Sequence, residues 1–304
     1  MGINVLSLFG GMEVFRQAFK DEGIEINKYY SSEVYEPSIR VANKNHNDII
    51  QLGDITLIDE DVLRTLPKID IIGFGFPCKN LSRTVINNPE HNQGLEGEHS
   101  KLFYEAVRIL NWIRKHNNPN VLFLCENVES MDDEDRDIIT EYLNVNPVMI
   151  DSALVSAQDR KRYYWTNINN GTISQPEDKG LVLNDIIEPY ENVPKKYWYD
   201  KPFDFHGHDK KVCATVHVSG HDILKRVNNP DFKSATLTAC RGGNTQKKVF
   251  QNSKPRKLMP IEYERLQTLP DGYTEGESDS TRYNMLGDGW TLDVIAHILS
   301  FAKL

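Results

Sequence analysis

Short apolar runs alternate with amphipathic stretches over the first 168 residues of the chain. The apolar runs predict buried strands at residues 4–9, 29–34, 69–76 and 121–125, with two more at 147–155 and 163–167 around a charged turn. Amphipathic spacing predicts helices at residues 12–20, from about Pro37, and at 100–116. Continuous apolar strands that alternate with helices favour an α/β fold with a doubly wound, mostly parallel sheet.

The pattern changes after about residue 170. Residues 171–256 are rich in Gly, Asn, Asp, Lys and Pro, and they contain short β-like pieces at 211–218 and 235–239. Helical spacing returns at 260–269 and 291–301, and the last of these segments is apolar enough to pack on the first domain. We therefore expect a first domain over 1–170, a smaller irregular domain over 171–257, and a C-terminal segment over 258–304 that returns to the first domain.

Composition narrows the class of protein. Of the 304 residues, 39% are hydrophobic and 26% are charged, which is typical of an ordinary folded protein. No apolar run reaches the roughly 18 residues of a membrane span, and the N-terminus lacks the features of a signal peptide. The four cysteines form no C-x-x-C pair, so we expect free thiols in a reducing cytoplasm and no metal site.

The net charge of −9 argues weakly against a nucleic-acid partner, but the distribution of charge matters more than the sum. Acidic residues gather at 132–137 and 275–279. Basic residues gather in a strip that follows Arg241 and comprises Lys247, Lys248, Lys254, Arg256 and Lys257. This strip could follow a phosphate backbone, or it could be an ordinary solvated loop.

Residues suited to a nucleoside cofactor lie at the ends of the first strands. In an open α/β sheet, ligands bind beyond the carboxyl ends of the strands. Phe9-Gly10-Gly11 forms a glycine turn after the first strand, and Glu33 ends the second, where an acid commonly holds ribose hydroxyls. Gly53-Asp54-Ile55 could bind the edge of a base and pack on it. A tight structural turn is the alternative interpretation of the glycines.

A second group of polar residues lies further along the same sheet. Cys78 follows the strand that ends in Gly-Phe-Gly-Phe, and Glu126 follows the next strand. Arg160 and Arg162 precede Tyr163-Tyr164-Trp165, and on a strand their spacing of two would put them on one side. Each residue alone could be structural, as a packed thiol, a salt-bridged core acid or a solvated turn. Their common position at strand ends favours a site.

The order of these motifs resembles the carbon-5 cytosine DNA methyltransferase family. The resemblance rests on Pro77-Cys78, Glu126-Asn127-Val128, Gln158-x-Arg160-x-Arg162, Glu264-Arg265-Leu266-Gln267 and Gly287-Asp288-Gly289-Trp290, and only about 170–255 lacks a match. The segments SEVYEPSI, NPVMID, VSAQDRKRYYW and GDGWTLDVI look most like the catalytic domain of the animal de novo methyltransferases. Since no regulatory domains are attached, we expect a bacterial or phage enzyme of that branch.

The resemblance implies a Rossmann-like methyltransferase domain that binds S-adenosylmethionine. Glu33 would take the ribose hydroxyls and Asp54 the adenine edge, and the pocket would be lined by Phe9, Gly11, Val34, Ile55, Pro77, Asp288 and Trp290. Two positions depart from the family pattern, because Glu13 stands near an expected glycine and Asp288 replaces an expected Asn. Both put a carboxylate near the expected pocket, so we expect a working but weak cofactor site.

The resemblance also implies the reaction. Cys78 would attack carbon 6 of a cytosine flipped out of duplex DNA, and Glu126 would bind ring nitrogen 3. Arg162 would orient the base, and Arg160 would support the Cys78 loop or a phosphate. Residues 171–257 would be the target-recognition region. We expect DNA contacts from Asn80, Ser82, Arg241, Asn244, Lys247 and Lys248.

Two other functions remain open. A tRNA cytosine-5 methyltransferase would share the fold and the chemistry, although that branch carries a Cys-Phe-Thr motif that is absent from this sequence. A catalytically inactive DNA-binding paralogue would be expected to lose Pro-Cys, Glu-Asn or the arginines, and all of these are present. The DNA sequence recognised, the oligomeric state and the biological role, such as restriction–modification, do not follow from the sequence.

Overall fold

The computed structural model describes residues 2–78, 81, 94–98, 100–240 and 244–304. The chain divides into two compact units. The first contains the residues up to Ile150, Lys161–Gln175 and Ile295–Leu304, and the second contains Asp151–Arg160 and Pro176–Val294. Of the segment 258–304, the last ten residues group with the first unit and the others with the second.

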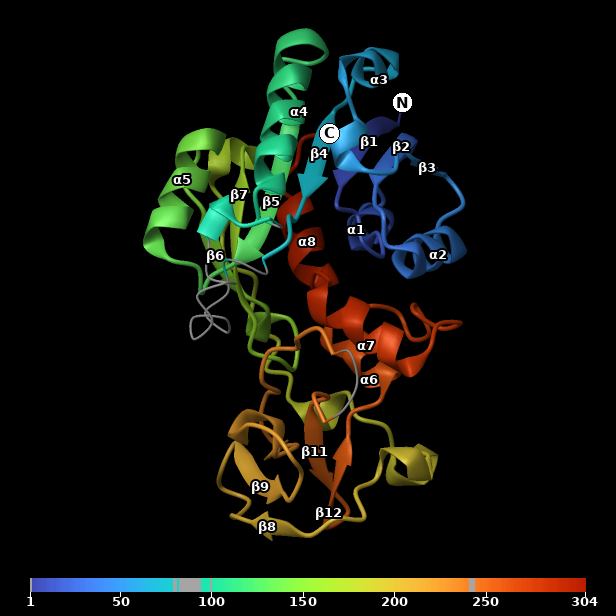
Figure 1. Cartoon of the computed structure of the whole chain (residues 1–304), viewed down its shortest axis with the longest axis vertical. Helices are drawn as coiled ribbons and strands as arrows, with labels where there is room; N and C mark the ends of the chain where they lie inside the picture. Colours follow the sequence, from blue (N-terminus) through green and yellow to red (C-terminus); the bar gives the residue numbers. More distant parts are fainter. Residues whose placement is uncertain (1, 79–80, 82–93, 99, 241–243) are drawn as a thin grey trace. The chain divides into compact units, whose positions relative to one another are not determined.

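A seven-stranded sheet forms the centre of the first unit (Figure 1). The strand order is β3-β2-β1-β4-β5-β7-β6, and the strands from β3 to β5 are parallel, whereas β7 runs antiparallel to β5. The predicted α/β fold with a mostly parallel sheet is confirmed. The strands are β1 (Ile3–Leu8), β2 (Ile26–Ser32), β3 (Ile49–Gln51), β4 (Ile71–Phe74), β5 (Leu122–Val128), β6 (Val148–Asp151) and β7 (Lys161–Thr166).

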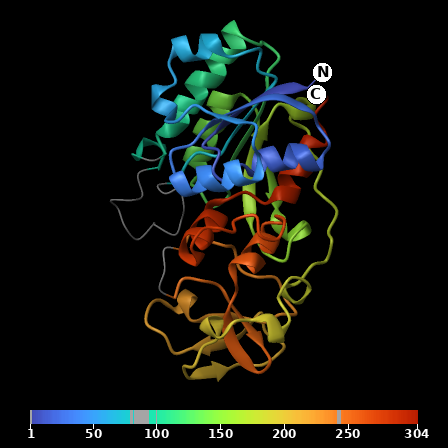
Figure 2. The ribbon, with the colours of Figure 1, turned by 90° about the vertical axis from the view of Figure 1, so that its right-hand side faces the viewer.

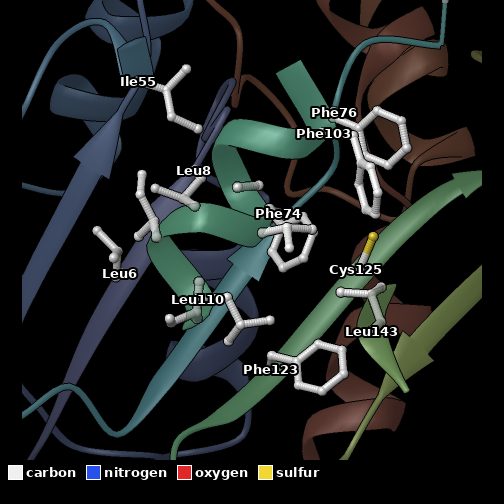
Figure 3. Packing of buried hydrophobic residues seen from close by; sticks show 14 of the residues in the cluster. Leu6, Leu8, Ile55, Phe74, Phe76, Phe103, Leu110, Phe123, Cys125 and Leu143 are labelled. Carbon is white, nitrogen blue, oxygen red and sulfur yellow. The ribbon is translucent and has the colours of Figure 1, made fainter. Parts of the chain in front are cut away.

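Alternate residues of the central strands serve the two faces of this sheet. Leu6, Leu8 and Phe74 belong to one buried cluster with residues of the long helix α4 (Leu102–His116), including Leu110 (Figure 3). Gly73 faces the other side, where an added Cβ would lie 2.3 Å from the Phe15 ring of helix α1. The apolar runs of the sequence therefore reflect strands that are covered by helices on both faces.

The helices of the chain follow the predicted pattern in part. The segments predicted as helical correspond to α1, α2, α4, α6 and α8, whereas α3, α5 and α7 were not predicted. The bounds are α1 (Val14–Asp21), α2 (Glu36–Asn45), α3 (Glu60–Thr65), α4 (Leu102–His116), α5 (Asp133–Leu143), α6 (Pro260–Leu266), α7 (Asp279–Asp288) and α8 (Leu292–Leu299).

The second unit contains a five-stranded sheet in the order β12-β11-β10-β9-β8. Its segments are coloured yellow to orange in Figure 2. Its strands are β8 (Phe203–Phe205), β9 (Val212–Val216), β10 (Arg226–Asn228), β11 (Lys248–Gln251) and β12 (Lys254–Lys257). The β-like piece at 211–218 is thus a strand, but the prediction for 235–239 was wrong. There the Leu237 amide donates to the side chain of Gln158, and the Thr236 hydroxyl donates to the Asp159 carbonyl, in place of strand pairing.

Neither a membrane span nor a metal centre is found in the part of the chain that the structure covers. No helix there is long and apolar enough to cross a bilayer. No group of three or more His, Cys, Asp or Glu side chains among those residues is arranged to hold a metal ion.

Candidate active site

Cys78 differs from the other cysteines in its exposure. Cys125, Cys213 and Cys240 are buried, whereas Cys78 is half-buried, four residues beyond the end of β4. Burial raises the pKa of the Cys125 thiol well above its usual range. Since the thiolate is the reactive form, Cys125 is chemically inert, and Cys78 is the thiol that a ligand can reach.

Hydrogen bonds to three of its backbone carbonyls hold the start of the loop that carries Cys78. Asn127 donates its side-chain amide to the Phe76 carbonyl at 3.1 Å, and Ser100 donates to the Pro77 carbonyl at 3.2 Å. The amide of Leu81 donates to the Cys78 carbonyl at 3.0 Å. Neither Asn127 nor Ser100 was predicted to have this role, although Asn127 lies within the Glu126-Asn127-Val128 motif.

Glu126 of β5 and Arg162 of β7 form an ion pair on the strands that neighbour the Cys78 loop. The guanidinium Nε lies 2.9 Å from a carboxylate oxygen of Glu126, and both side chains are almost buried, at 12% and 11% exposure. The prediction that Glu126 follows the end of its strand was wrong, because β5 continues to Val128. Phe74, the last residue of β4, is paired with Cys125. Residues 126–128 of β5 therefore extend beyond β4, and they are paired with β7.

Arg160 does not share the environment of Arg162. It precedes β7, is 2% exposed, and donates to the carbonyls of Leu237, Gly287 and Gly289, at 2.8 Å for the last. The prediction that both arginines lie on one side of a strand was wrong. Because its guanidinium is buried among these carbonyls, the prediction of a phosphate contact was also wrong for Arg160.

The segment that Arg160 contacts is held tightly within the second unit. Gln267 donates to the carbonyls of Leu286 and Gly289, and an added Cβ at Gly287 would lie 2.2 Å from backbone carbon of Thr238. Arg160 and Gln267 therefore fix the shape of the segment 287–290. Within that segment Asp288 is exposed at the end of α7, and Trp290 is half-buried.

The glycine turn after β1 is bonded to the acid at the end of β2. Phe9 and Gly11 both adopt positive φ angles, of 55° and 56°. The Glu33 carboxylate accepts from the amides of Gly11 at 2.7 Å, Val34 at 2.8 Å and Tyr35 at 2.7 Å. A carboxylate offers about four acceptor positions, so these three bonds orient Glu33 and leave it some capacity for a ligand.

Several of the expected cofactor residues in the first unit are open to solvent. A Cβ added at Gly11 or Gly53 would meet nothing within 4 Å, and the Val34 side chain is 66% exposed. Asp54 is exposed and caps the turn at Ile55–Leu57 through its bond to the Thr56 amide, and Ile55 is buried beneath it. Gly11, Gly53 and the Val34 side chain are therefore accessible to a ligand.

Glu13 points into the protein and not outward. It is fully buried and accepts a bond from the Tyr29 hydroxyl at 2.5 Å. Our expectation that this carboxylate confronts the cofactor therefore needs revision.

The residues predicted to contact DNA fall into three groups. Asn80, Ser82 and Arg241 lie outside the described residues. Asn244 and Lys247 are half-buried in the second unit. Lys248 is 1% exposed, and its ammonium donates to the carbonyls of Asn244 and Gln246. The prediction that Lys248 contacts phosphate was therefore wrong.

The basic strip is also smaller than the sequence indicated. Arg256 is fully buried, and its guanidinium forms two bonds with the Glu262 carboxylate, at 2.8 and 2.6 Å. A buried arginine in a bidentate pair contributes no charge to a docking surface. Lys247, Lys254 and Lys257 remain as the accessible or half-buried members of the strip.

Comparison with known proteins identifies the family of this chain. The model of the family described as C-5 cytosine-specific DNA methylase matches residues 3–302. The chain therefore belongs to the C-5 cytosine-specific DNA methylase family, and its class of enzyme is DNA (cytosine-5-)-methyltransferase. Type II methyltransferase M.HhaI of Haemophilus parahaemolyticus is 26% identical, over 98% of this chain and 93% of that protein. Type II methyltransferase M.NlaX of Neisseria lactamica is 24% identical, over 98% and 96%.

Solved structures share the fold at low sequence identity. The methyltransferase EhMeth of Entamoeba histolytica has a TM-score of 0.70 at 15% identity, with 99% of this chain and 98% of that chain covered. A DNMT2 mutant of Spodoptera frugiperda also has a TM-score of 0.70, at 18% identity, with 99% of each chain covered. These likenesses support the α/β architecture.

Proposed function

We propose that this protein transfers a methyl group from S-adenosylmethionine to carbon 5 of a cytosine in duplex DNA, with Cys78 as the nucleophile. The observation that carries the proposal is a half-buried thiol on an anchored strand-end loop, with an almost buried Glu126–Arg162 pair on the neighbouring strands. The three side chains supply a nucleophile, an acid and a cation, which is the set that this reaction needs.

The chemistry explains why these residue types occur together. Carbon 5 of cytosine is a weak nucleophile. Addition of the Cys78 thiolate to carbon 6 shifts electron density to carbon 5 and makes it reactive. Glu126, in its protonated form, would donate its proton to ring nitrogen 3 and accept from the exocyclic amine, so that charge does not build up on the ring as the thiolate adds. S-adenosylmethionine supplies the electrophilic methyl group.

The other steps return the enzyme to its starting state. Arg162 orients the base at its carbonyl oxygen, while its bond to Glu126 keeps the carboxylate in position. After methylation a base removes the proton from carbon 5, and elimination releases Cys78. A water molecule is the simplest base for this step. In a duplex the cytosine must first be flipped out of the stack.

The first unit offers residues that fit the cofactor. Glu33 would hold the ribose hydroxyls, because three backbone amides orient its carboxylate and leave acceptor capacity. Val34 and Ile55 would pack on the adenine, and Asp54 would bind its edge. Gly11 and Phe9 would form the turn beneath it, with Pro77 at the side of the cysteine loop. Asp288 and Trp290 would contribute from the segment that Arg160 and Gln267 hold.

We retain Asn80, Ser82, Arg241, Asn244 and Lys247 as proposed DNA contacts. Arg241 suits guanine, and Lys247 would hold a phosphate, which would make binding sensitive to salt. Residues 171–257 would form most of the target-recognition region. Arg160 acts as a positioning residue for the segment 287–290.

The decisive experiment measures methylated nucleosides by mass spectrometry after incubation with S-adenosylmethionine. Duplex DNA and tRNA are used as separate substrates. We expect 5-methylcytosine in DNA with the wild type and none with Cys78→Ala. Cys125→Ala is the matched control, and it should retain methylation because that thiol is buried and inert. Product in tRNA alone would favour the tRNA enzyme. No product in either substrate, from folded protein, would favour the inactive DNA-binding paralogue.

A further inference from the structure

Glu13 supports the glycine turn from inside the protein. It caps α1 in a left-handed conformation, with φ of 58°, and its side chain is fully buried. Two hydroxyls of β2 bond to its carboxyl group: Tyr29 donates to Oε2 at 2.5 Å, and Ser31 donates to Oε1. A Cβ added at Gly10 would lie 1.9 Å from Oε1, so the turn packs directly on this carboxyl group.

The same turn is held from its other side by a second carboxyl group. Glu33 accepts from the Gly11 amide at 2.7 Å, and it lies two residues beyond Ser31. The turn at residues 9–11 thus lies between two carboxyl groups. Glu13 bonds to hydroxyls of β2, and Glu33 directly follows the end of β2. Three backbone amides stabilise the charge of Glu33, and the hydroxyls of Tyr29 and Ser31 bond to Glu13.

The surroundings of Glu13 favour its neutral form. Burial raises its pKa from 4.5 to about 7, the bonds from Ser31, Tyr29 and Ser7 of β1 oppose this rise, and the charge of Glu33 adds to it. Among the groups that shift this pKa, Tyr29 and Glu33 are titratable. Arg16, on the same helix, pairs with Asp48 at 2.8 Å.

We propose that Glu13 is a positioning residue that holds the cofactor-binding turn in shape while its carboxyl group is protonated, and that its ionisation weakens cofactor binding. The proposal rests on the proposed cofactor. A ligand that covers the turn removes water from it and so favours the uncharged acid beneath. Since binding linkage is reciprocal, the proton must then strengthen binding of the ligand.

Isothermal titration calorimetry with S-adenosylhomocysteine tests this between pH 6 and 8.5. S-adenosylhomocysteine, the product of methyl transfer, lacks the sulfonium charge, so its direct attraction to Glu13 or Glu33 is reduced. We expect the wild-type Kd to rise up to about tenfold per pH unit above about pH 7. In Glu13→Gln, which imitates the neutral acid, this rise should disappear. Titration of the ligand's own groups is common to both proteins, so the ratio of their Kd values is the readout.

Tyr29→Phe gives an independent test. It removes a bond that favours ionised Glu13, so the rise in Kd should begin at a higher pH than in the wild type. A merely structural role would lower affinity at every pH and would not move the midpoint. If circular dichroism shows that Glu13→Gln is unfolded, the shift in Tyr29→Phe alone decides the matter.

The failures of the two proposals are distinguishable. The inference is overturned if wild type and Glu13→Gln show the same pH dependence, or if Tyr29→Phe leaves the midpoint in place. Absence of binding at every pH, by all folded proteins and with S-adenosylmethionine as well, would overturn the proposed cofactor together with this inference.

Discussion

The Glu126–Arg162 pair is more easily explained by chemistry than by stability. Both side chains are almost buried at 2.9 Å separation, and the desolvation of two charges offsets most of their attraction. A well-packed apolar pair at these positions would stabilise the sheet at least as well. The charged pair lies where β5 and β7 extend beyond β4, close to the anchored cysteine loop. Its position there favours a role in catalysis.

Arg162→Lys should lower kcat at least a hundredfold in the methylation assay. A lysine keeps the charge, but it lacks the planar guanidinium that can bond Glu126 and a base together. That fold-change corresponds to about 2.7 kcal/mol of transition-state stabilisation. Arg64→Lys is the control, because Arg64 forms exposed pairs with Glu60 and Asp61 on α3 and should be silent. Equal activity in the two variants would remove Arg162 from the mechanism.

At the scale of elements, apolar periodicity predicted what lies in the core. The central strands and α4 were found because their side chains face a single large cluster. The strand β3 has three residues, too few for a periodic signal. Helix α5 was hidden in the acidic cluster at 132–137, although acids favour a helix N-terminus, and Ile139 and Leu143 follow at a spacing of four.

The partners of charged residues could not be read from the sequence. In the sequence Lys248 and Arg256 look like members of a basic surface, yet both are buried. Backbone carbonyls accept from the Lys248 ammonium, and the Glu262 carboxylate pairs with Arg256. Arg160 lies just before β7 and Arg162 lies within it, because β7 begins at Lys161. Tertiary contacts decide such cases, and contacts between distant segments leave no local pattern.

Gly287→Ala tests the close approach of α7 to the segment at 238–239. Alanine favours a helix by roughly 0.5–1 kcal/mol over glycine. The added methyl group would lie 2.2–2.4 Å from backbone atoms of Thr238 and Ala239, which cannot rotate away. We expect a net loss of about 1–3 kcal/mol, seen as a lower urea midpoint. Ser280→Ala, at an exposed position of the same helix, should change stability by less than about 0.5 kcal/mol. A Gly287→Ala protein as stable as the wild type would contradict the tight packing.

For the whole molecule, two buried groups act on the pH dependence of stability in opposite directions. Burial raises the pKa of Glu13 from 4.5 to about 7, so folding favours its protonated form, and this stability is lost as pH rises from about 4.5 through 7. His46, 5% exposed after α2, has its pKa lowered from 6.5 to about 4 by burial and by Arg16. Folding favours its neutral form, so this stability is lost as pH falls from about 6.5 through 4.

Single substitutions should therefore reveal two opposite slopes of the unfolding free energy against pH, which nearly cancel in the wild type. Each shift is worth about 3 kcal/mol at most. Between pH 5 and 6.5 Glu13→Gln should become more stable as pH rises, because His46 alone remains, and His46→Gln should become less stable. Urea unfolding at several pH values measures both slopes, and the double variant should return to the wild-type profile apart from a constant offset. Slopes of the same sign in the two single variants would show that these groups do not control stability in this range. Opposite slopes would show that Glu13 exchanges its proton near neutral pH in the folded protein, as its proposed role in cofactor binding requires.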